Sequence, residues 1–413
     1  MPFIYKSLKT HVLQASVAVV ALTLAACGYN SSSNNNTTKV QTTGIKKRVL
    51  ISNQQVGSVT IIDAQKDQLS TKAFGVTGAS KLVTGSGQTV VMPTNSTNIQ
   101  VIDNATEQST VSLTLRDQPF DIAISATDGK TAYAAMRNVG EIAVFNTTNG
   151  NLFSITGIQT VSRLVEGPNE KRLLAFADNP VGGNTFYVID TSTNIRTPIS
   201  SPQLDQPFTA VFDTTDTGDN TAFILNCGSE CGGTTASVIR VNFSNPAAPV
   251  FGAPIPVAAA TVGVLSGSNL FIAGSPSAGA HGTVQTINTG TSAVSAATTI
   301  TNGRHLKMVV ASNNRLYIGA SGCTATQDSA TGLTKGCLSI LNTTSGAVVI
   351  PEVTSIRQNF DVTGIQPISG RTVVYVCLGG ELDIFDTTSD IEIQPNPPID
   401  IVGKAFDVVL IDP

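Results

Sequence analysis

The chain has 413 residues, and its share of charged residues, 13%, is about half that of an average globular protein. It holds 24 Lys and Arg residues against 28 Asp and Glu residues, and the basic ones form no run or patch. Nucleic acid is therefore excluded from the expected partners, because its recognition depends on clustered positive charge.

The N-terminal segment has the pattern of an export signal. Two lysines precede an apolar stretch, residues 12–26, which is too short to span a bilayer comfortably. The sequence Leu24-Ala25-Ala26-Cys27 resembles the lipobox of bacterial lipoproteins, a family in which the cysteine is acylated and the peptide before it is removed. The resemblance implies a lipoprotein signal peptide over residues 1–26 and lipidation of Cys27. An ordinary secretory signal and a short buried helix are the alternatives.

The residues after Cys27 predict where the protein resides. Residues 27–45 are rich in Ser, Asn and Thr, so we expect a flexible tether behind the acylated cysteine. Gly28, rather than Asp, follows the cysteine, and by resemblance to proteobacterial sorting rules this favours the outer membrane. We therefore expect a protein of the bacterial cell envelope that is anchored to a membrane by lipid and faces the periplasm or the exterior.

A strand motif of the type Val-Ile-Asp recurs eight times from residue 46 onwards. Consecutive copies end 40 to 54 residues apart, and the final residues are Asp63, Asp103, Asn146, Asp190, Asn242, Asn288, Asn342 and Asp386. A strand-built repeat of about 40–50 residues is typical of β-propeller blades. Each Asp or Asn stands before turn residues, so we expect it to cap its turn by accepting backbone N–H groups rather than to bind metal.

An opening strand precedes seven of the eight motifs, as in Phe120-Asp121-Ile122-Ala123-Ile124-Ser125. The first motif lacks it, and a matching segment occurs at residues 405–412. We therefore expect residues 46–413 to form an all-β propeller whose C-terminal strand completes the first blade and closes the ring. The count predicts eight four-stranded blades, although seven is the more usual number.

The repeat is similar to that of the YVTN-type β-propeller proteins. Residues 120–125, Asp128-Gly129 and residues 131–134 form the best copy, and the match covers about residues 46–413. The resemblance implies a secreted or surface protein with a binding role, and related propellers include lactonases and dehydrogenase domains. An eight-bladed lipoprotein of the outer-membrane assembly machinery has Trp-containing blades, whereas this chain has no Trp.

Two pairs of cysteines stand in the two longest repeats. Cys227 and Cys231, and Cys323 and Cys337, each lie between the second strand and the Val-Ile-Asp strand of a repeat. Exported proteins form disulfides, so we predict two disulfide-closed loops on one rim; a four-cysteine zinc site is the alternative. Cys377, in an apolar strand, is predicted to be buried and inert.

The opening strands supply one candidate site for a metal or ligand. Asp121, Asp361 and Asp407 stand at or near their starts, and His305 falls within one residue of the same place. Side chains at one channel mouth could hold Ca²⁺ or position metal-bound water against an ester. The alternative is that each Asp is solvated or caps a loop.

The favoured function is non-enzymatic. We predict no catalytic residue and no cofactor, with Ca²⁺ as the ion that the four side chains would bind. The expected protein is a monomeric scaffold whose disulfide-closed loops and channel mouth bind an envelope protein, a glycan or a small ligand. The alternative is a metal-assisted lactonase or esterase with its site in the central channel.

Overall fold

The computed structural model describes residues 42–125, 129–277, 279–354, 357, 359–395 and 399–412. The predicted signal peptide, Cys27 and most of the predicted tether lie outside the described residues. None of the helical segments in these ranges has the length and hydrophobicity that a membrane crossing requires.

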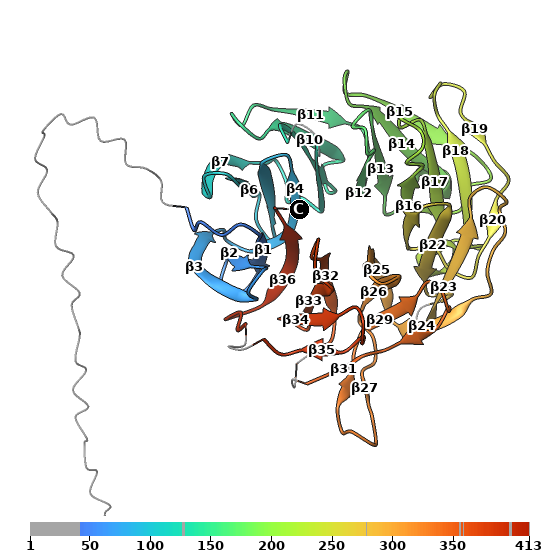
Figure 1. The fold of residues 1–413 in the computed structure, drawn as a ribbon. Helices are drawn as coiled ribbons and strands as arrows, with labels where there is room; N and C mark the ends of the chain where they lie inside the picture. The colour runs from blue at the N-terminus through green and yellow to red at the C-terminus, as the bar shows by residue number, and fades with distance from the viewer. Residues whose placement is uncertain are drawn as a thin grey trace, which may run out of the picture. The chain divides into compact units, whose positions relative to one another are not determined.

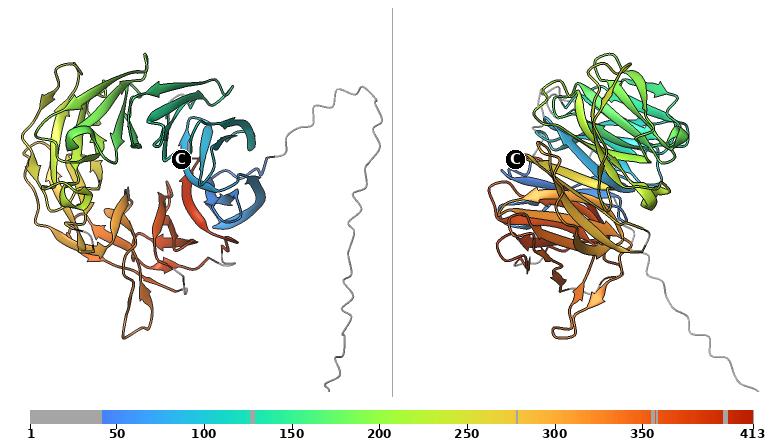
Figure 2. Two further views of the ribbon diagram at one scale, coloured as in Figure 1. Left: turned by 180° about the vertical axis from the view of Figure 1, so that it is seen from behind. Right: turned by 90° about the vertical axis from the view of Figure 1, so that its right-hand side faces the viewer.

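Antiparallel sheets around a common centre make up the domain that begins at residue 42 (Figure 1). Eight of the sheets hold four or five strands, and each of these contains one Val-Ile-Asp strand. We number these eight sheets in chain order and describe each from its innermost to its outermost strand. The view from behind shows the same succession of sheets around the centre (Figure 2).

Sheet 1 contains β36 (Ala405–Leu410), β1 (Arg48–Asn53), β2 (Ser58–Asp63) and β3 (Gln68–Gly75). Sheet 2 contains β4 (Ala79–Gly85), β5 (Gln88–Pro93), β6 (Asn98–Asp103) and β7 (Gln108–Thr114). Sheet 3 contains β8 (Asp121–Ile124), β9 (Thr131–Met136), β10 (Glu141–Asn146) and β11 (Leu152–Thr156). Sheet 4 contains β12 (Val161–Glu166), β13 (Arg172–Ala177), β14 (Thr185–Asp190) and β15 (Ile195–Ser200), with a short 3-10 helix, η1 (Val181–Gly183), before β14.

Sheet 5 contains β16 (Pro207–Phe212), β17 (Thr221–Asn226), β18 (Ser237–Asn242), β19 (Val250–Phe251) and β20 (Ile255–Pro256), with η2 (Gly228–Cys231) before β18. Sheet 6 contains β21 (Val262–Ser266), β22 (Asn269–Gly274), β23 (His281–Asn288) and β24 (Thr298–Asn302). Sheet 7 contains β25 (Arg304–Ala311), β26 (Arg315–Ser321), β29 (Leu338–Asn342) and β30 (Val348–Val349). Sheet 8 contains β32 (Val362–Pro367), β33 (Val373–Leu378), β34 (Glu381–Asp386) and β35 (Glu392–Ile393). A small separate sheet joins β27 (Thr326–Gln327), β28 (Thr334–Lys335) and β31 (Glu352–Val353).

Burial explains why the strands of one sheet differ in composition. All six residues of β33 are buried, whereas only one of the seven residues of β7 is. The second strand of each sheet is covered on both faces by the neighbouring sheets, so it is buried over most of its length and mainly apolar. The outermost strands face solvent and hold at most two buried residues each. The core therefore consists of layers between adjacent sheets, such as the layer in which Ile51 of sheet 1 and Tyr375 of sheet 8 are buried.

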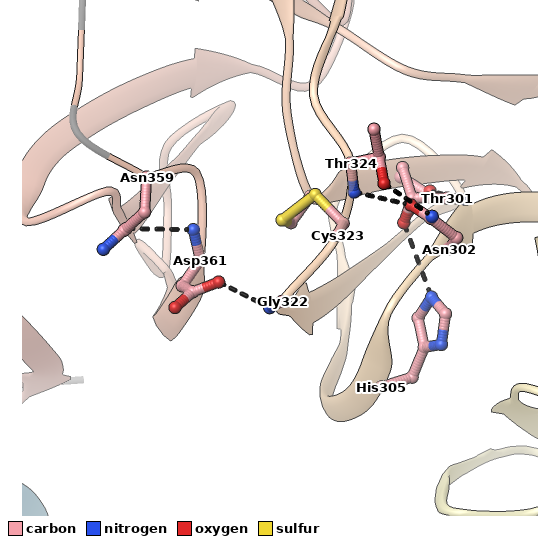
Figure 3. The surroundings of a disulfide bond; sticks show 10 residues. Thr301, Asn302, His305, Gly322, Cys323, Thr324, Asn359 and Asp361 are labelled. Atoms are coloured by element: carbon pink, nitrogen blue, oxygen red, sulfur yellow. Dashed lines mark hydrogen bonds between the residues drawn. A yellow bond between two sulfur atoms is a disulfide. The ribbon is translucent and has the colours of Figure 1, made fainter. Parts of the chain in front are cut away.

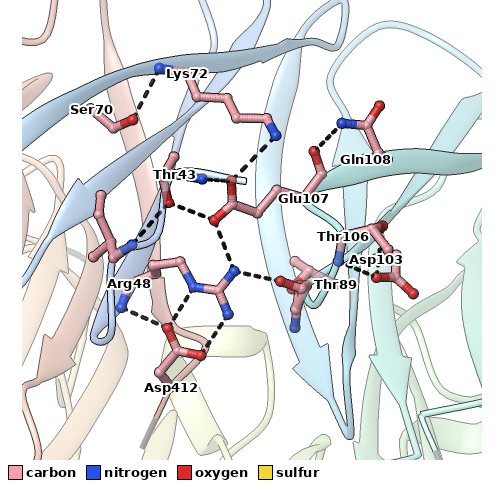
Figure 4. Close-up of polar contacts among 12 residues, drawn as sticks. Thr43, Arg48, Ser70, Lys72, Thr89, Asp103, Thr106, Glu107, Gln108 and Asp412 are labelled. Atoms are coloured by element: carbon pink, nitrogen blue, oxygen red, sulfur yellow. Dashed lines mark hydrogen bonds and ion pairs between the residues drawn. The ribbon is translucent and has the colours of Figure 1, made fainter. Parts of the chain in front are cut away.

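The C-terminal strand closes the ring as predicted. Strand β36 pairs with β1 in antiparallel register, with Val49 opposite Leu410. The Arg48 guanidinium donates to both carboxylate oxygens of Asp412, at 2.6 and 2.7 Å, and to Glu107 of sheet 2 at 3.0 Å (Figure 4). Glu107 also accepts a hydrogen bond from the Thr43 amide at 2.7 Å, so this buried carboxylate joins the start of the domain to Arg48, which in turn binds Asp412 after the closing strand.

The two ends of the strands form two different rims. We call the connections that follow the innermost and the third strand of each sheet the turn rim. On this rim each Val-Ile-Asp strand ends in a side-chain oxygen that accepts a backbone N–H from two or three residues further on. These capping residues are Asp63, Asp103, Asn146, Asp190, Asn242, Asn288, Asn342 and Asp386. The prediction that they cap turns is confirmed.

The connections after the second strand of each sheet, together with those that lead to the next sheet, form the opposite rim, which we call the loop rim. Both predicted disulfides lie on it: Cys227–Cys231 encloses η2, and Cys323–Cys337 closes the insertion that carries β27 and β28 (Figure 3). The four-cysteine zinc alternative is wrong, because all four thiols are oxidised in these two bonds. Cys377 lies buried in β33, and burial raises the pKa of its thiol.

Candidate functional site at the loop rim

A β-bulge marks the loop-rim end of most innermost strands. The register shifts after the first residue of β36, β4, β12, β16 and β32, and after the second residue of β25. The residue skipped by the pairing is Phe406 in sheet 1, Phe208 in sheet 5 and Leu306 in sheet 7. In sheets 4 and 8 it is Ser162 and Thr363. Bulges redirect side chains, so they decide which residues of the opening strands face the centre of the ring.

Asp407 and Asp121 are used to join neighbouring sheets. Asp407 comes directly after the bulge of β36, and its Oδ2 accepts the Leu82 amide of sheet 2 at 2.9 Å. Asp121 of sheet 3 accepts the Leu164 amide of sheet 4 at 2.8 Å. Each carboxylate also pairs with a lysine, Asp121 with Lys81 and Asp407 with Lys307, the latter at 3.7 Å. Both groups thus hold adjacent innermost strands together.

Asp361 and His305 occupy different positions in their strands from that of Asp407, which directly follows a bulge (Figure 3). Asp361 precedes β32, and its Oδ1 accepts the Gly322 amide at 2.6 Å. His305 stands before the bulge of β25, where β36 has Ala405 and β12 has Val161, and it is fully buried. Burial lowers the pKa of His305 to about 4, so the imidazole is neutral near pH 7.

The four side chains of the predicted site do not form a metal centre. Within the described ranges, no group of three or more His, Cys, Asp or Glu side chains is placed to hold a metal ion. In β25 His305 stands before the bulge and is buried in the core, whereas Asp121 and Asp407 each accept a backbone amide of the neighbouring sheet. The geometry therefore gives the predicted Ca²⁺ ion no support.

A cluster of arginine and phenylalanine side chains occupies the loop-rim end of the innermost strands, and the sequence analysis missed it. The Cζ atom of Arg163 lies 3.5 Å from the ring centroid of Phe208, and that of Arg304 lies 5.3 Å from it. Arg137 covers the ring of Phe120 at 5.1 Å. The three arginines come from sheets 3, 4 and 7, so the ring geometry rather than sequence proximity brings them together.

One carboxylate serves two of these arginines. Asp178 pairs with Arg163 at 3.2 Å and with Arg137 at 3.0 Å. Burial, together with the charge of Arg304, lowers the pKa of Arg163 to about 10, so the guanidinium remains charged near pH 7. Glu230, from the Cys227–Cys231 loop, accepts the Ser275 amide at 2.9 Å, and burial raises the pKa of its carboxyl group. The cluster and one disulfide-closed loop thus share the same part of the loop rim.

A cavity of about 640 Å³ opens at the turn rim between sheets 3 and 4. Its walls include Ser125, Glu170, Arg172 and Asp190. These groups are already paired, since Ser125 donates to Glu170 at 2.6 Å and Arg172 forms an ion pair with Asp190. We regard this cavity as a structural gap between turns, because its polar groups bind each other.

Comparisons with known proteins bear on the fold. No family model and no curated protein matches the chain. Among solved structures, the dihydro-heme d1 dehydrogenase NirN in complex with DHE is similar with a TM-score of 0.66 and 10% identity, over 89% of this chain and 75% of that chain. Apo AztD from Citrobacter koseri is similar with a TM-score of 0.58 and 13% identity, over 88% and 98% of the two chains. At such identities the likeness concerns the fold alone, and together with the sheet topology it establishes that the chain is a β-propeller.

Proposed function

We propose that this protein is a lipid-anchored β-propeller of the cell envelope that binds a partner protein on its loop rim without catalysing a reaction. The two disulfides are consistent with an extracytoplasmic protein, since such bonds persist in oxidising compartments. Anchoring through Cys27 and an outer-membrane address rest on the sequence pattern. The alternative is that the loop rim binds a glycan or a small ligand instead of a protein.

The contrast between the rims carries the proposal. The turn rim repeats one capped turn eight times, whereas the loop rim carries two disulfide-closed insertions and the arginine cluster. Loops held on a rigid scaffold commonly carry function, and a closed loop loses less entropy when it binds. A metal-assisted hydrolase is not favoured, because Asp121, Asp361 and Asp407 each accept a backbone amide.

Site-specific photo-crosslinking in cells tests the docking face. The full chain receives a photoreactive residue either at Val181 or at Ile195. Both side chains belong to sheet 4 and are 63% and 64% exposed, but they lie on the loop rim and the turn rim, respectively. We expect a discrete crosslinked protein from position 181 and none from position 195. Equal crosslinking from both positions, or from position 195 alone, would overturn the assignment of the loop rim.

Anchoring is tested separately from docking. Replacement of Cys27 by Ser removes the predicted acylation site. We expect the variant to leave the membrane fraction and to keep its crosslink from position 181 if the partner reaches the same compartment. A variant that stays in the membrane fraction would contradict lipid anchoring without affecting the docking face.

A further inference from the structure

Phe208 is the point at which two guanidinium groups meet. It is the skipped residue in the bulge of β16, yet only 5% of its surface is exposed, because Arg163 of sheet 4 covers its ring and Arg304 of sheet 7 approaches it. A guanidinium group over an aromatic face gains from the ring's electron density. The ring therefore acts as a platform that holds cations from two non-adjacent sheets close together.

The charges at this platform are not balanced by the described residues. Arg163 shares Asp178 with Arg137, whereas Arg304 is exposed and forms no ion pair within 4 Å in the ranges that the structure describes. The repulsion between Arg163 and Arg304 is part of what lowers the pKa of Arg163. Glu230 interacts with Arg304 only through its charge, and its carboxylate accepts the Ser275 amide at 2.9 Å. Three guanidinium groups therefore share one directly paired carboxylate.

We propose that Arg304, with Arg163 behind it, forms a recognition site for a carboxylate group at the loop rim. The inference rests on the proposed docking function and gives the chemistry of its contact. The guanidinium group presents a planar fork of donors that matches a carboxylate in a bidentate manner. The Phe208 face limits how the fork can turn, and the unpaired charge of Arg304 is neutralised on binding. The carboxylate comes from an acidic segment of the partner protein or from a small free acid.

Calorimetric titration of the purified full chain distinguishes the two sources. The probes are a hexaglutamate peptide and free glutarate, each titrated at low salt because such contacts are screened. The variants are R304Q and, as a matched control, R240Q, since Arg240 of β18 in sheet 5 is also an exposed arginine but forms an ion pair with Asp213 at 3.2 Å. Thermal melting checks that R304Q folds, which we expect because its guanidinium forms no ion pair within 4 Å among the described residues.

We expect wild type to bind at least one probe, R304Q to bind it roughly tenfold more weakly, and R240Q to match wild type. Binding of the peptide alone assigns the carboxylate to a partner protein, and binding of glutarate alone assigns it to a small ligand. Absence of binding, or equal binding by R304Q and wild type, would overturn the carboxylate site. The crosslink from position 181 is measured independently, so either proposal can fail while the other stands.

Discussion

The turn rim and the loop rim are built from the same eight sheets but follow opposite rules. On the turn rim, Asp or Asn recurs at the same place in every sheet and makes the same local hydrogen bond, as Asp63 and Asn342 show. On the loop rim the connections differ in length and content, and two of them carry disulfides. The comparison teaches that positions repeated within the chain serve the fold, whereas positions that break the repeat are the candidates for function.

The largest expected effect on stability comes from removing the disulfides of the loop rim, and the two bonds should differ in size of effect. The Cys323–Cys337 bond joins residues 14 apart, and the Cys227–Cys231 bond joins residues 4 apart. By loop-closure entropy, replacing Cys323 and Cys337 with Ser should lower the free energy of unfolding by about 3 kcal/mol, and replacing the shorter pair by about 2 kcal/mol. Urea unfolding of both double variants measures the difference. Equal losses would show that loop length does not govern the effect.

Acid should affect the two rims over different pH ranges. The pKa of His305 is lowered from 6.5 to about 4, so folding favours the neutral imidazole. The stability that the neutral His305 contributes is fully present above pH 6.5 and is lost as the pH falls through 4. The total loss of unfolding free energy is about 3 kcal/mol. On the turn rim the pKa of Asp103 and that of Asp190 lie below 3.8, so the stability that they contribute is lost only at lower pH.

Unfolding free energies of wild type and His305→Gln between pH 7.5 and 4.5 test this order. The wild type should lose more stability than the variant over this range. Asp383 acts in the opposite direction, because burial raises its pKa to about 6 and protonation then favours the folded state below that pH. The difference between the two proteins cancels the Asp383 contribution, and parallel curves would contradict the role of His305.

Gly282, near the start of β23, and Gly290, two residues after its end, provide a matched test of how tightly the two rims are packed. A Cβ at Gly282, on the loop-rim side, would overlap the His305 ring and lie 2.8 Å from the Thr301 carbonyl oxygen. A Cβ at Gly290, on the turn rim, would meet only the Asn288 side chain at 3.5 Å. We expect Gly282→Ala to cost about 1–3 kcal/mol and Gly290→Ala to change stability by less than about 0.5 kcal/mol. Thermal denaturation of both variants measures the two losses of stability. Equal melting temperatures would contradict the expected difference between the two positions.

A modest effect is expected from the loss of a single turn cap. The Asn342 side-chain oxygen accepts two backbone amides, those of Thr344 and Ser345, each at 3.0 Å. Asn342→Ala should therefore cost about 1 kcal/mol of stability and leave the crosslink from Val181 unchanged. Denaturant unfolding and crosslinking of the same variant measure both. A lost crosslink at unchanged stability would give the turn rim a role in docking.

The features that could be predicted from the sequence are local or repeated. Turn caps such as Asn342 bond to residues two or three positions away, and the cysteines of each disulfide lie in one loop. The closing strand was predictable because residues 405–412 match the opening strand that the first repeat lacks. Each of these conclusions needs only the sequence of one or two repeats.

The candidate site could not be read in the same way. A bulge shifts the strand by one residue, and no sequence pattern fixes whether His305 stands before or after it. The meeting of Arg163 with Arg304 depends on the curvature of a ring that spans sheets 4 to 7. The available signal was a phenylalanine near the start of three opening segments, Phe120, Phe208 and Phe406, each of which is covered by an arginine or lysine side chain.

The closing strand has a consequence for the order in which the protein is made. Synthesis delivers β1 first and β36 last, and Arg48 and Asp412, which hold them together, are 364 residues apart. Until the final segment arrives, β1 has an open edge whose N–H and C=O groups lack the partners that β36 supplies. A nascent chain that stops before residue 405 therefore exposes the unpaired edge of β1, to which a strand of another chain can bind. Pairing of β36 with β1 removes this edge and so prevents that misassembly.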